Sequence, residues 1–384
     1  MSQTGLDGVT VIYPGEHVAL RELTLLASPG ELLTVIGPSG SGKSTLLKSI
    51  AGLVGVAAGE VLIAGERVTR RATEQRDVAM VFEYNALLPF LNVAQNLAFG
   101  LTVRHTPRPE VEARVTEQAR GLRITRLLGR KPATLSAGEN GQVGIGRALM
   151  RAPSVFLLDE PLAHHDSADR LRMRQQIAST IKALGTTTFY VTHDRAEALA
   201  IGDRMAVLHA GQLAQLAAPR VIYSQPADVF VADFLGTTPL GLLPARLVSS
   251  GEQAGFQVAA RTLPLWGPVP PELRRYEGRD VLVGFREEDV HEATHDPDPA
   301  AVTLPGAVAS AEYAGSHSMV TIDVAAPPVT RPGENRSTPA QLRARFSGRS
   351  AVRPGTAVAV YVNAQHAHVF DPATGRALHH PAPR

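Results

Sequence analysis

The stretch Gly37-Pro38-Ser39-Gly40-Ser41-Gly42-Lys43-Ser44-Thr45 decides the fold of this 384-residue chain. It satisfies the pattern G-x-x-x-x-G-K-[ST], follows the apolar run Leu32 to Ile36, and precedes a segment of helical character. The glycines let backbone N–H groups turn towards an anion at the amino end of a helix. Lys43 supplies a cation to phosphates, and the Ser44 hydroxyl can ligate Mg²⁺. The stretch therefore predicts a nucleotide-binding loop between a strand and a helix.

A second motif places two acidic residues after another apolar run. The run Val155 to Leu158 reads as a short buried strand, and Asp159 and Glu160 follow it directly. Beside a phosphate-binding loop, the first carboxylate can hold Mg²⁺ through water, and the second can orient or deprotonate an attacking water. An apolar strand that ends in acids is common and is weak evidence alone. Together with the loop at residues 37–45, it predicts hydrolysis of a nucleoside triphosphate.

The composition excludes several other classes of protein. Hydrophobic residues make up 44% and charged residues 19% of the chain, which suits a packed core and not a disordered chain. The absence of cysteine excludes disulfide scaffolds, thiolate metal sites and cysteine nucleophiles. A net charge of +2 gives no field that favours nucleic acid as the main partner. Met1 to Gly8 lacks a signal-like apolar segment and no membrane span is visible, so we expect a cytoplasmic chain, which can still dock on a membrane partner.

The chain divides into two regions of different character. As far as about residue 235, short apolar runs alternate with helical segments, the pattern of a parallel sheet covered on both faces. Beyond Gly236, helical periodicity fades, and short alternating stretches lie between Pro- and Gly-rich segments, which fits one or two small antiparallel barrels. We predict a first domain at residues 1–236 and a second, β-rich domain at residues 237–384.

Further segments resemble the ATPases of ABC transporters, in the order and spacing of that family. Leu135-Ser136-Ala137-Gly138-Glu139 resembles the LSGGQ signature, and His193 resembles the switch histidine. Val81-Phe82-Glu83 lies where the family has its Q-loop, and Asp166 lies in the D-loop. The resemblance extends over residues 5 to 235 nearly without a gap.

The carboxyl-terminal part narrows the resemblance to one branch. Residues 226–236 look like the junction in the maltose, polyamine and ferric-iron importer ATPases, in which a barrel domain of the TOBE type follows. Pro354-Gly355 and residues 368–371 resemble the end of such a domain. The resemblance implies an α/β P-loop NTPase fold of the ABC type, with a mixed sheet and a helical subdomain at about residues 84–150. A small all-β, OB/TOBE-like domain for regulation or dimerisation follows it.

The resemblance also implies a composite active site, in which two copies close head to tail around ATP and Mg²⁺. The implied catalytic residues are Glu160, His193 and Glu83, and the implied Mg²⁺ ligands are Ser44, Glu83 and Asp159. Tyr13 matches the aromatic residue that stacks on adenine. The implied nucleotide-binding residues are Tyr13, Gly37, Ser39, Gly40, Gly42, Lys43, Ser44, Thr45, Ser136, Gly138 and Asp166.

The implied function is that of the ATP-hydrolysing subunit of an ABC importer, peripheral on the inner face of the cell membrane. Its partners would be a second copy or a related subunit, the permease subunits and, indirectly, an extracellular solute-binding protein. Tyr84 to Leu91 lies where the family receives the coupling helix of the permease. The apolar residues of that segment suit such a socket and suit an ordinary core equally well. No residue specifies the solute, because in this family it meets the permease and its receptor.

Several positions depart from the family pattern. Glu83 and Glu139 replace glutamine, Ala137 replaces the first glycine of the signature, and residues 163–166 read Ala-His-His-Asp in place of Ser-Asn-Leu-Asp. One interpretation is drift within a working ATPase, which we favour because the core chemical residues Lys43, Asp159, Glu160 and His193 all remain. The other is an ATPase slowed by weakened contacts across the dimer, where one lost donor can cost about 10²–10³ in rate.

Two further functions come from other classes. A soluble ABC ATPase acting on DNA or ribosomes is disfavoured by the absence of a basic stripe or coiled-coil insertion and by the barrel-like tail. A phosphotransferase is disfavoured by the signature and the switch histidine. The adjacent histidines at 164–165 and 379–380 carry no metal prediction, because adjacent side chains diverge and no third ligand is evident.

Overall fold

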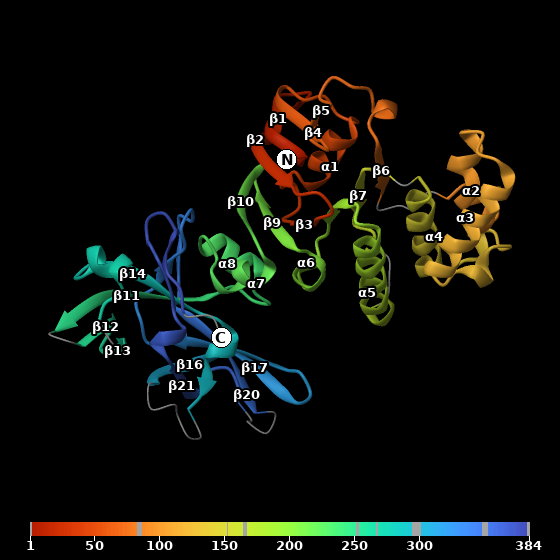
Figure 1. Ribbon diagram of the computed structural model, residues 1–384. Coiled ribbons are helices and arrows are strands. Elements are labelled where there is room, and N and C mark those ends of the chain that lie inside the picture. Colours follow the sequence, from red (N-terminus) through yellow and green to blue (C-terminus); the bar gives the residue numbers. More distant parts are fainter. Residues whose placement is uncertain are drawn as a thin grey trace. The chain divides into compact units, whose positions relative to one another are not determined.

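The loop at residues 37–45 joins strand β3 (Leu32–Ile36) to helix α1 (Lys43–Ala51), as the sequence predicts. The structure is a computed structural model that describes residues 2–82, 87–151, 153–163, 167–250, 253–265, 268–293, 301–347 and 352–381. It comprises two compact units, Met1–Arg220 and Val221–Arg384 (Figure 1). Among the described residues, no helix has the length and apolar character needed to cross a bilayer.

The first unit is built on a six-stranded sheet with β3 near its centre. The strand order is β10-β9-β3-β8-β7-β6, in which every neighbouring pair is parallel except β10 with β9. The strands besides β3 are β6 (Val78–Val81), β7 (Val155–Asp159), β8 (Thr187–Val191), β9 (Arg204–His209) and β10 (Gln212–Ala217). Every residue of β3, β7 and β8 is buried, which explains their nearly continuous apolar sequences.

A second, antiparallel sheet in the same unit has the order β2-β1-β4-β5. Its strands are β1 (Thr4–Tyr13), β2 (His17–Ala27), β4 (Ala58–Ile63) and β5 (Glu66–Arg67). Helix α1 buries Leu46, Leu47 and Ile50 in one core shared with side chains of both sheets. Burial of each of these side chains contributes about 1.5–3 kcal/mol to the stability of the fold. The helix that follows the glycine-rich loop is therefore held by contacts with both sheets.

Helices α5 (Ser167–Leu184) and α6 (Arg195–Ile201) pack through Met173, Ile177 and Ile201 in a core with the opposite faces of β7 and β8. A separate helical core joins α2 (Val93–Val103), α3 (Arg108–Gly121) and α4 (Ala137–Leu149). This group is the helical subdomain that the family resemblance implies.

The second unit contains a six-stranded sheet and a closed barrel. The sheet order is β13-β12-β11-β14-β22-β23, and the barrel order is β15-β20-β17-β16-β21. One core cluster includes residues of both, so the predicted small β-barrel architecture is confirmed. The strands of the sheet are β11 (Gly241–Ser250), β12 (Gln253–Val258), β13 (Arg261–Leu265), β14 (Asp280–Phe285), β22 (His368–Phe370) and β23 (Ala377–His379). Those of the barrel are β15 (His291–Glu292), β16 (Val302–Tyr313), β17 (His317–Val324), β20 (Gln341–Ser347) and β21 (Ala357–Val362).

Smaller elements complete the chain. Helix α7 (Pro219–Ser224) spans the junction of the two units, and β18 (Val329–Thr330) pairs with β19 (Ser337–Thr338). Helix α8 (Val229–Leu235) packs Val229 and Ala232 against Leu242 and Phe370 of the second unit. The boundary proposed at residue 236 remains a prediction.

Arg76 closes the carboxyl end of α1. Its guanidinium group, in a residue only 4% exposed, donates to the carbonyl oxygens of Ser49 and Ile50 at 2.7 and 3.0 Å. It also donates to the carbonyls of Thr69 and Arg71 at 3.0 and 3.1 Å. A single side chain therefore satisfies terminal carbonyls of the helix and ties them to the segment before β6.

Replacing Arg76 by alanine should lower the free energy of unfolding by about 2–4 kcal/mol, because four hydrogen bonds from a charged donor to carbonyl oxygens are lost, two of them buried and two partly buried. Denaturant unfolding of the whole chain, followed by circular dichroism, measures the change. The exposed Arg70→Ala variant is the matched control and should shift the midpoint little. Equal effects of the two variants would contradict the assigned role of Arg76.

Candidate functional site

The glycine-rich loop adopts a backbone that side chains would disturb. Gly42 directly precedes α1 with a φ of 99°, and a Cβ there would lie 2.7 Å from the Ala19 carbonyl oxygen. A Cβ on Gly37 would lie 2.3 Å from the Leu208 carbonyl oxygen and 2.5 Å from Ser41 Oγ. These contacts require glycine at both positions, since one needs a left-handed backbone and both need close approach.

Lys43 is held across this loop. Its ammonium group donates to the carbonyl oxygens of Gly37 and Pro38 at 2.8 and 2.9 Å, and the residue is 8% exposed. Burial lowers the pKa of Lys43, while the negative charges of Glu160 and Asp159 oppose that shift. The ammonium group therefore lies close to two carboxylates at a site that is largely shielded from water, where electrostatic interactions are stronger than in bulk water.

The loop also contains an unsatisfied polar atom. Ser41 Oγ is buried and has no hydrogen-bond partner within the part of the chain that the structure describes. A buried hydroxyl without a partner is costly unless a ligand or water satisfies it. Together with the Lys43 cation and the amino end of α1, it fits a phosphate group in the loop.

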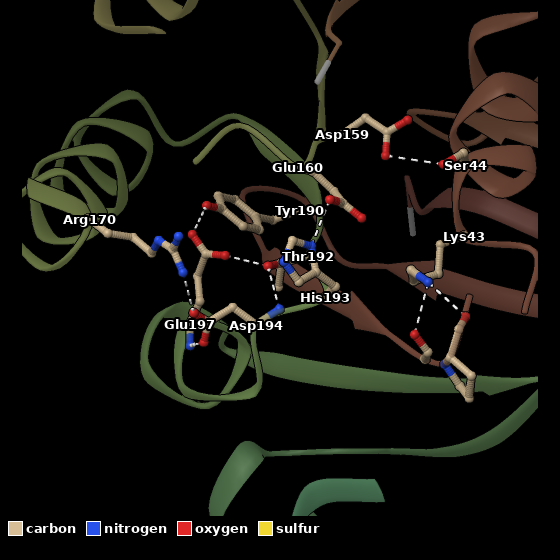
Figure 2. Close-up of polar contacts among 12 residues, drawn as sticks. Lys43, Ser44, Asp159, Glu160, Arg170, Tyr190, Thr192, His193, Asp194 and Glu197 are labelled. Atoms are coloured by element: carbon tan, nitrogen blue, oxygen red, sulfur yellow. Dashed lines mark hydrogen bonds and ion pairs between the residues drawn. The ribbon is translucent and has the colours of Figure 1, made fainter. Parts of the chain in front are cut away.

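Ser44 and Asp159 bring oxygen atoms together from two elements. The Ser44 hydroxyl, at the start of α1, donates to Asp159 Oδ1 at the end of β7 over 3.3 Å. Figure 2 shows this pair beside Lys43 and Glu160. A hydroxyl and a carboxylate are oxygen ligands of the kind that Mg²⁺ prefers, so these residues fit the predicted metal site. The third predicted ligand, Glu83, lies outside the described residues.

Glu160 and His193 meet at the ends of β7 and β8. His193 Nδ1 lies 2.7 Å from Glu160 Oε2, and their side chains are 60% and 23% exposed. An ionised carboxylate only accepts hydrogen bonds, so Nδ1 carries the proton in this contact and Nε2 is left for another group. Glu160 has a φ of 48°, an uncommon value for a residue other than glycine. Such strain often accompanies a functional position.

The signature residues begin a helix in the helical subdomain. The Ser136 hydroxyl accepts from the Glu139 N–H at 3.2 Å, and the Glu139 carboxylate accepts from the Ser136 N–H at 3.1 Å. This reciprocal capping box leads into α4. Glu139, which replaces the family glutamine, also forms ion pairs with Arg126 at 3.1 Å and Arg130 at 3.4 Å. Ser136 and Gly138 line a polar cleft of about 710 Å³ between α4 and α5.

The structure brings some predicted residues together and leaves others apart. The Tyr13 hydroxyl lies 3.4 Å from Thr45 Oγ1, which places the predicted adenine-stacking residue next to the loop. No hydrogen bond joins Ser136 to the loop at residues 37–45 in the described chain. Asp166, like Glu83, lies outside the described residues.

Sequence reasoning missed Glu197, a buried carboxylate that Figure 2 shows between Tyr190 and Thr192, close to His193 in the chain. Asp194 and Glu197 have the spacing of a capping box, and the Asp194 side chain does accept from the Glu197 N–H at 2.9 Å. The Glu197 carboxylate, however, accepts from the hydroxyls of Tyr190 and Thr192. The spacing could indicate the cap but not the inward turn of that side chain.

A mainly apolar groove of about 540 Å³ lies beside β6 and the helical subdomain. Its lining includes Phe82, Leu87, Leu88, Phe99 and Val103, together with the arginines at 104, 147 and 151. Phe82, Phe99 and Val103 are 47%, 43% and 62% exposed. Leu87 belongs also to the helical core, so for this residue both interpretations of the segment apply.

Comparison with known proteins identifies the family. Residues 20–163 match the ABC transporter domain family, and residues 283–370 match the TOBE domain family. The chain is 37% identical to the sn-glycerol-3-phosphate import ATP-binding protein UgpC 3 of Agrobacterium fabrum over 98% of this chain and 100% of that protein. The chain belongs to the ABC transporter ATP-binding proteins. This ABC ATPase binds and hydrolyses ATP as a subunit of an import system, which confirms the importer interpretation of the sequence.

Other relatives agree. The ABC ATPase is 42% identical to the trehalose import ATP-binding protein SugC of Mycobacterium tuberculosis, over 76% of this chain and 74% of that protein. It is 39% identical to the trehalose/maltose import ATP-binding protein MalK of Thermococcus litoralis, over 95% and 96%.

Two solved structures each resemble just over half of the chain. The dimeric post-hydrolysis state of the ATP-binding cassette MJ0796, bound to ADP and Pi, matches with a TM-score of 0.50 at 29% identity, over 56% of this chain and 98% of that one. The structure of cbiO1 from Clostridium perfringens, part of the ABC transporter complex cbiONQ, matches with a TM-score of 0.55 at 24% identity. That match covers 58% of this chain and 91% of the other and supports the fold alone.

Replacing Glu160 by glutamine should lower kcat for ATP hydrolysis by about 10²–10⁴, because the carboxylate that can activate water is removed. ATP binding should persist, since Lys43 and its loop contacts are unchanged. Steady-state phosphate release and equilibrium binding of a fluorescent ATP analogue measure the two properties. Hydrolysis at the unmodified rate would exclude Glu160 as the general base.

Proposed function

We propose that two copies of this ABC ATPase close head to tail around ATP, with each nucleotide between the glycine-rich loop of one copy and the signature of the other. The observation that carries this proposal is the gathering of Lys43, Ser44, Asp159, Glu160 and His193 at one edge of the parallel sheet. Ser136 starts a separate helix without a hydrogen bond to that loop in the described chain, which favours its supply from a second copy.

Each predicted residue then has a proposed task. Lys43 and the backbone N–H groups from Gly37 to Thr45 bind the phosphates, with Ser39, Gly40 and Gly42 in the loop and Tyr13 against adenine. Ser44 and Asp159, with Glu83, would hold Mg²⁺, which when bound neutralises charge on the phosphates. Glu160 accepts a proton from the attacking water, and His193 holds Glu160 in place. Gly138 and Ser136 of the second copy would approach the terminal phosphate. Asp166, which is outside the described residues, is proposed to lie at the interface between the two copies.

We propose that the groove beside β6 receives a helix of a membrane permease. Its mainly apolar lining and three exposed large side chains suit a protein contact more than a free surface. Asn96 fixes the neighbouring loop, since its side chain accepts from the Leu88 N–H and donates to the carbonyls of Leu88 and Leu91. The wall of the groove is thus preorganised, which lowers the entropic cost of docking. In this arrangement the ABC ATPase is cytoplasmic and peripheral on the inner face of the cell membrane.

The names of the relatives indicate a class of solute. UgpC 3 is named for import of sn-glycerol-3-phosphate, SugC for trehalose, and MalK of Thermococcus litoralis for trehalose and maltose. We therefore propose a sugar or a polyol phosphate, delivered by an extracellular binding protein. The barrel-containing second unit is proposed to serve regulation or dimerisation.

Replacing Val103 by glutamate should strongly reduce co-purification of permease subunits with the tagged ABC ATPase, because an exposed apolar contact is lost and the new carboxylate would have to give up water when a helix covers the groove. ATP hydrolysis by the isolated chain should stay within about twofold, since Val103 is distant in the chain from the phosphate loop. Leu184→Glu, at a half-exposed leucine in α5 and away from the groove lining, is the matched control. Permease capture by the Val103 variant, measured by mass spectrometry of detergent extracts, would contradict the docking proposal.

Restoring the family glycine with Ala137→Gly should change kcat by less than about threefold, because the chemical residues are all retained. Steady-state ATPase assays of the variant and the parent chain make the comparison. A gain of ten times or more would favour the alternative that this subunit is slowed through its signature.

A further inference from the structure

Glu197, Tyr190 and Thr192 form a buried network of hydrogen bonds close to His193 in the chain. None of the three has a role in the proposed chemistry. Glu197 on α6 is 3% exposed, and its two carboxylate oxygens accept separate hydrogen bonds (Figure 2). The Tyr190 hydroxyl donates to Oε1, and the Thr192 hydroxyl donates to Oε2. Tyr190 and Thr192 are 0% and 2% exposed, so the three groups satisfy one another away from bulk water.

The direction of each hydrogen bond follows from its neighbours. Thr192 Oγ1 accepts from the Asp194 N–H at 3.0 Å, so its own proton is directed at Glu197. The Tyr190 hydroxyl points to the other oxygen, and both contacts call for a carboxylate that accepts twice. Burial raises the pKa of Glu197, and the hydrogen bonds from Thr192 and Tyr190 oppose that rise. The Asp194 charge also raises the pKa and Arg170 lowers it.

The same network fixes the backbone around His193. Tyr190, in the buried strand β8, and Thr192, just after its end, both donate to the Glu197 carboxylate, which fixes the chain immediately before His193. His193 Nδ1 contacts Glu160 at 2.7 Å. The next residue, Asp194, caps α6 through the Glu197 N–H and pairs with Arg170 of α5 at 3.2 Å. Positions 190, 192 and 194 are therefore all held, and His193 lies between the last two.

We propose that Glu197 is a positioning residue, which aims His193 at Glu160 by fixing the hydroxyls of Tyr190 and Thr192. The inference rests on the proposed roles of His193 and Glu160 in hydrolysis. Among the described residues, no hydrogen bond or ion pair joins Glu197 to the phosphate loop or to Tyr13, so we expect it to act on the rate of the chemical step and not on ATP binding. The His193 side chain is itself 60% exposed, so its orientation depends on the residues that precede and follow it in the chain.

Glutamine cannot reproduce the network. Its amide offers one accepting oxygen and one donating NH₂ group, whereas Tyr190 and Thr192 both present protons. If the oxygen faces Thr192, the NH₂ group meets the Tyr190 hydroxyl, whose own proton is left without an acceptor. A loosened loop should then lower kcat about 10- to 100-fold in Glu197→Gln, with KM for ATP within about twofold.

The deciding experiment is a double-mutant cycle on the full chain, with steady-state ATPase of Glu197→Gln, His193→Ala and the double variant. If Glu197 acts through His193, the double variant should have the kcat of His193→Ala within about twofold. Multiplied losses, or an unchanged kcat in Glu197→Gln, would overturn the inference. An unchanged kcat in His193→Ala would instead overturn the proposed reaction roles, so the two failures are distinguishable.

Two further variants separate positioning from loss of structure. Thr34 is also buried and donates to the Ala198 carbonyl of α6 at 3.3 Å, and no hydrogen bond joins it to Glu197 in the described part of the chain, so Thr34→Val should leave kcat within about twofold. If Glu197→Gln lacks a cooperative thermal transition, Tyr190→Phe replaces it, because only one hydroxyl is removed. This variant should lower kcat about 3- to 10-fold at constant KM, and no loss beyond that of Thr34→Val would overturn the inference.

Discussion

The site depends on the register in which strands β3, β7 and β8 pair, because it brings their carboxyl ends together. Val35 and Asp159 both pair with Val191 in parallel register, so the three strands end at the same height. The chain that leaves each strand supplies the phosphate loop, Glu160 or His193. Because all three strands are buried throughout, a shift in register would bring polar residues into the core and is strongly disfavoured.

The same edge carries features that cost stability. Lys43 is a buried cation, Ser41 Oγ has no partner in the described chain, and Glu160 has a left-handed backbone. Proteins tolerate such local conflicts where function requires them and the surrounding structure compensates. Here the compensation comes from α1, which is packed between two sheets and closed by Arg76. The strained edge therefore adjoins a helix that is held by both sheets and by Arg76.

Much of this edge could be predicted from the sequence, because glycines, a lysine and strand-terminal acids appear in contiguous motifs. The pairings of Ser44 with Asp159 and of Glu160 with His193 join residues far apart in the chain, yet they follow from parallel strands that end together. Glu197 could not be predicted in the same way, because its spacing from Asp194 equally suits a capping box and only tertiary packing turns the carboxylate inward. Arg76 likewise gains its role from the fold and not from a motif.

The groove and the site are linked by one pair of strands. Val81 of β6 pairs with Leu158 of β7, directly before Asp159, while Phe82 continues from β6 into the groove wall. A permease helix seated in the groove would bear on the end of β6, and the hydrogen-bonded neighbour of that end carries both acidic residues. When one buried, close-packed strand is displaced, its neighbour is displaced with it, because the side chains between them have few alternative packings. Docking of the proposed permease helix would therefore act on the two acidic residues through this strand pairing.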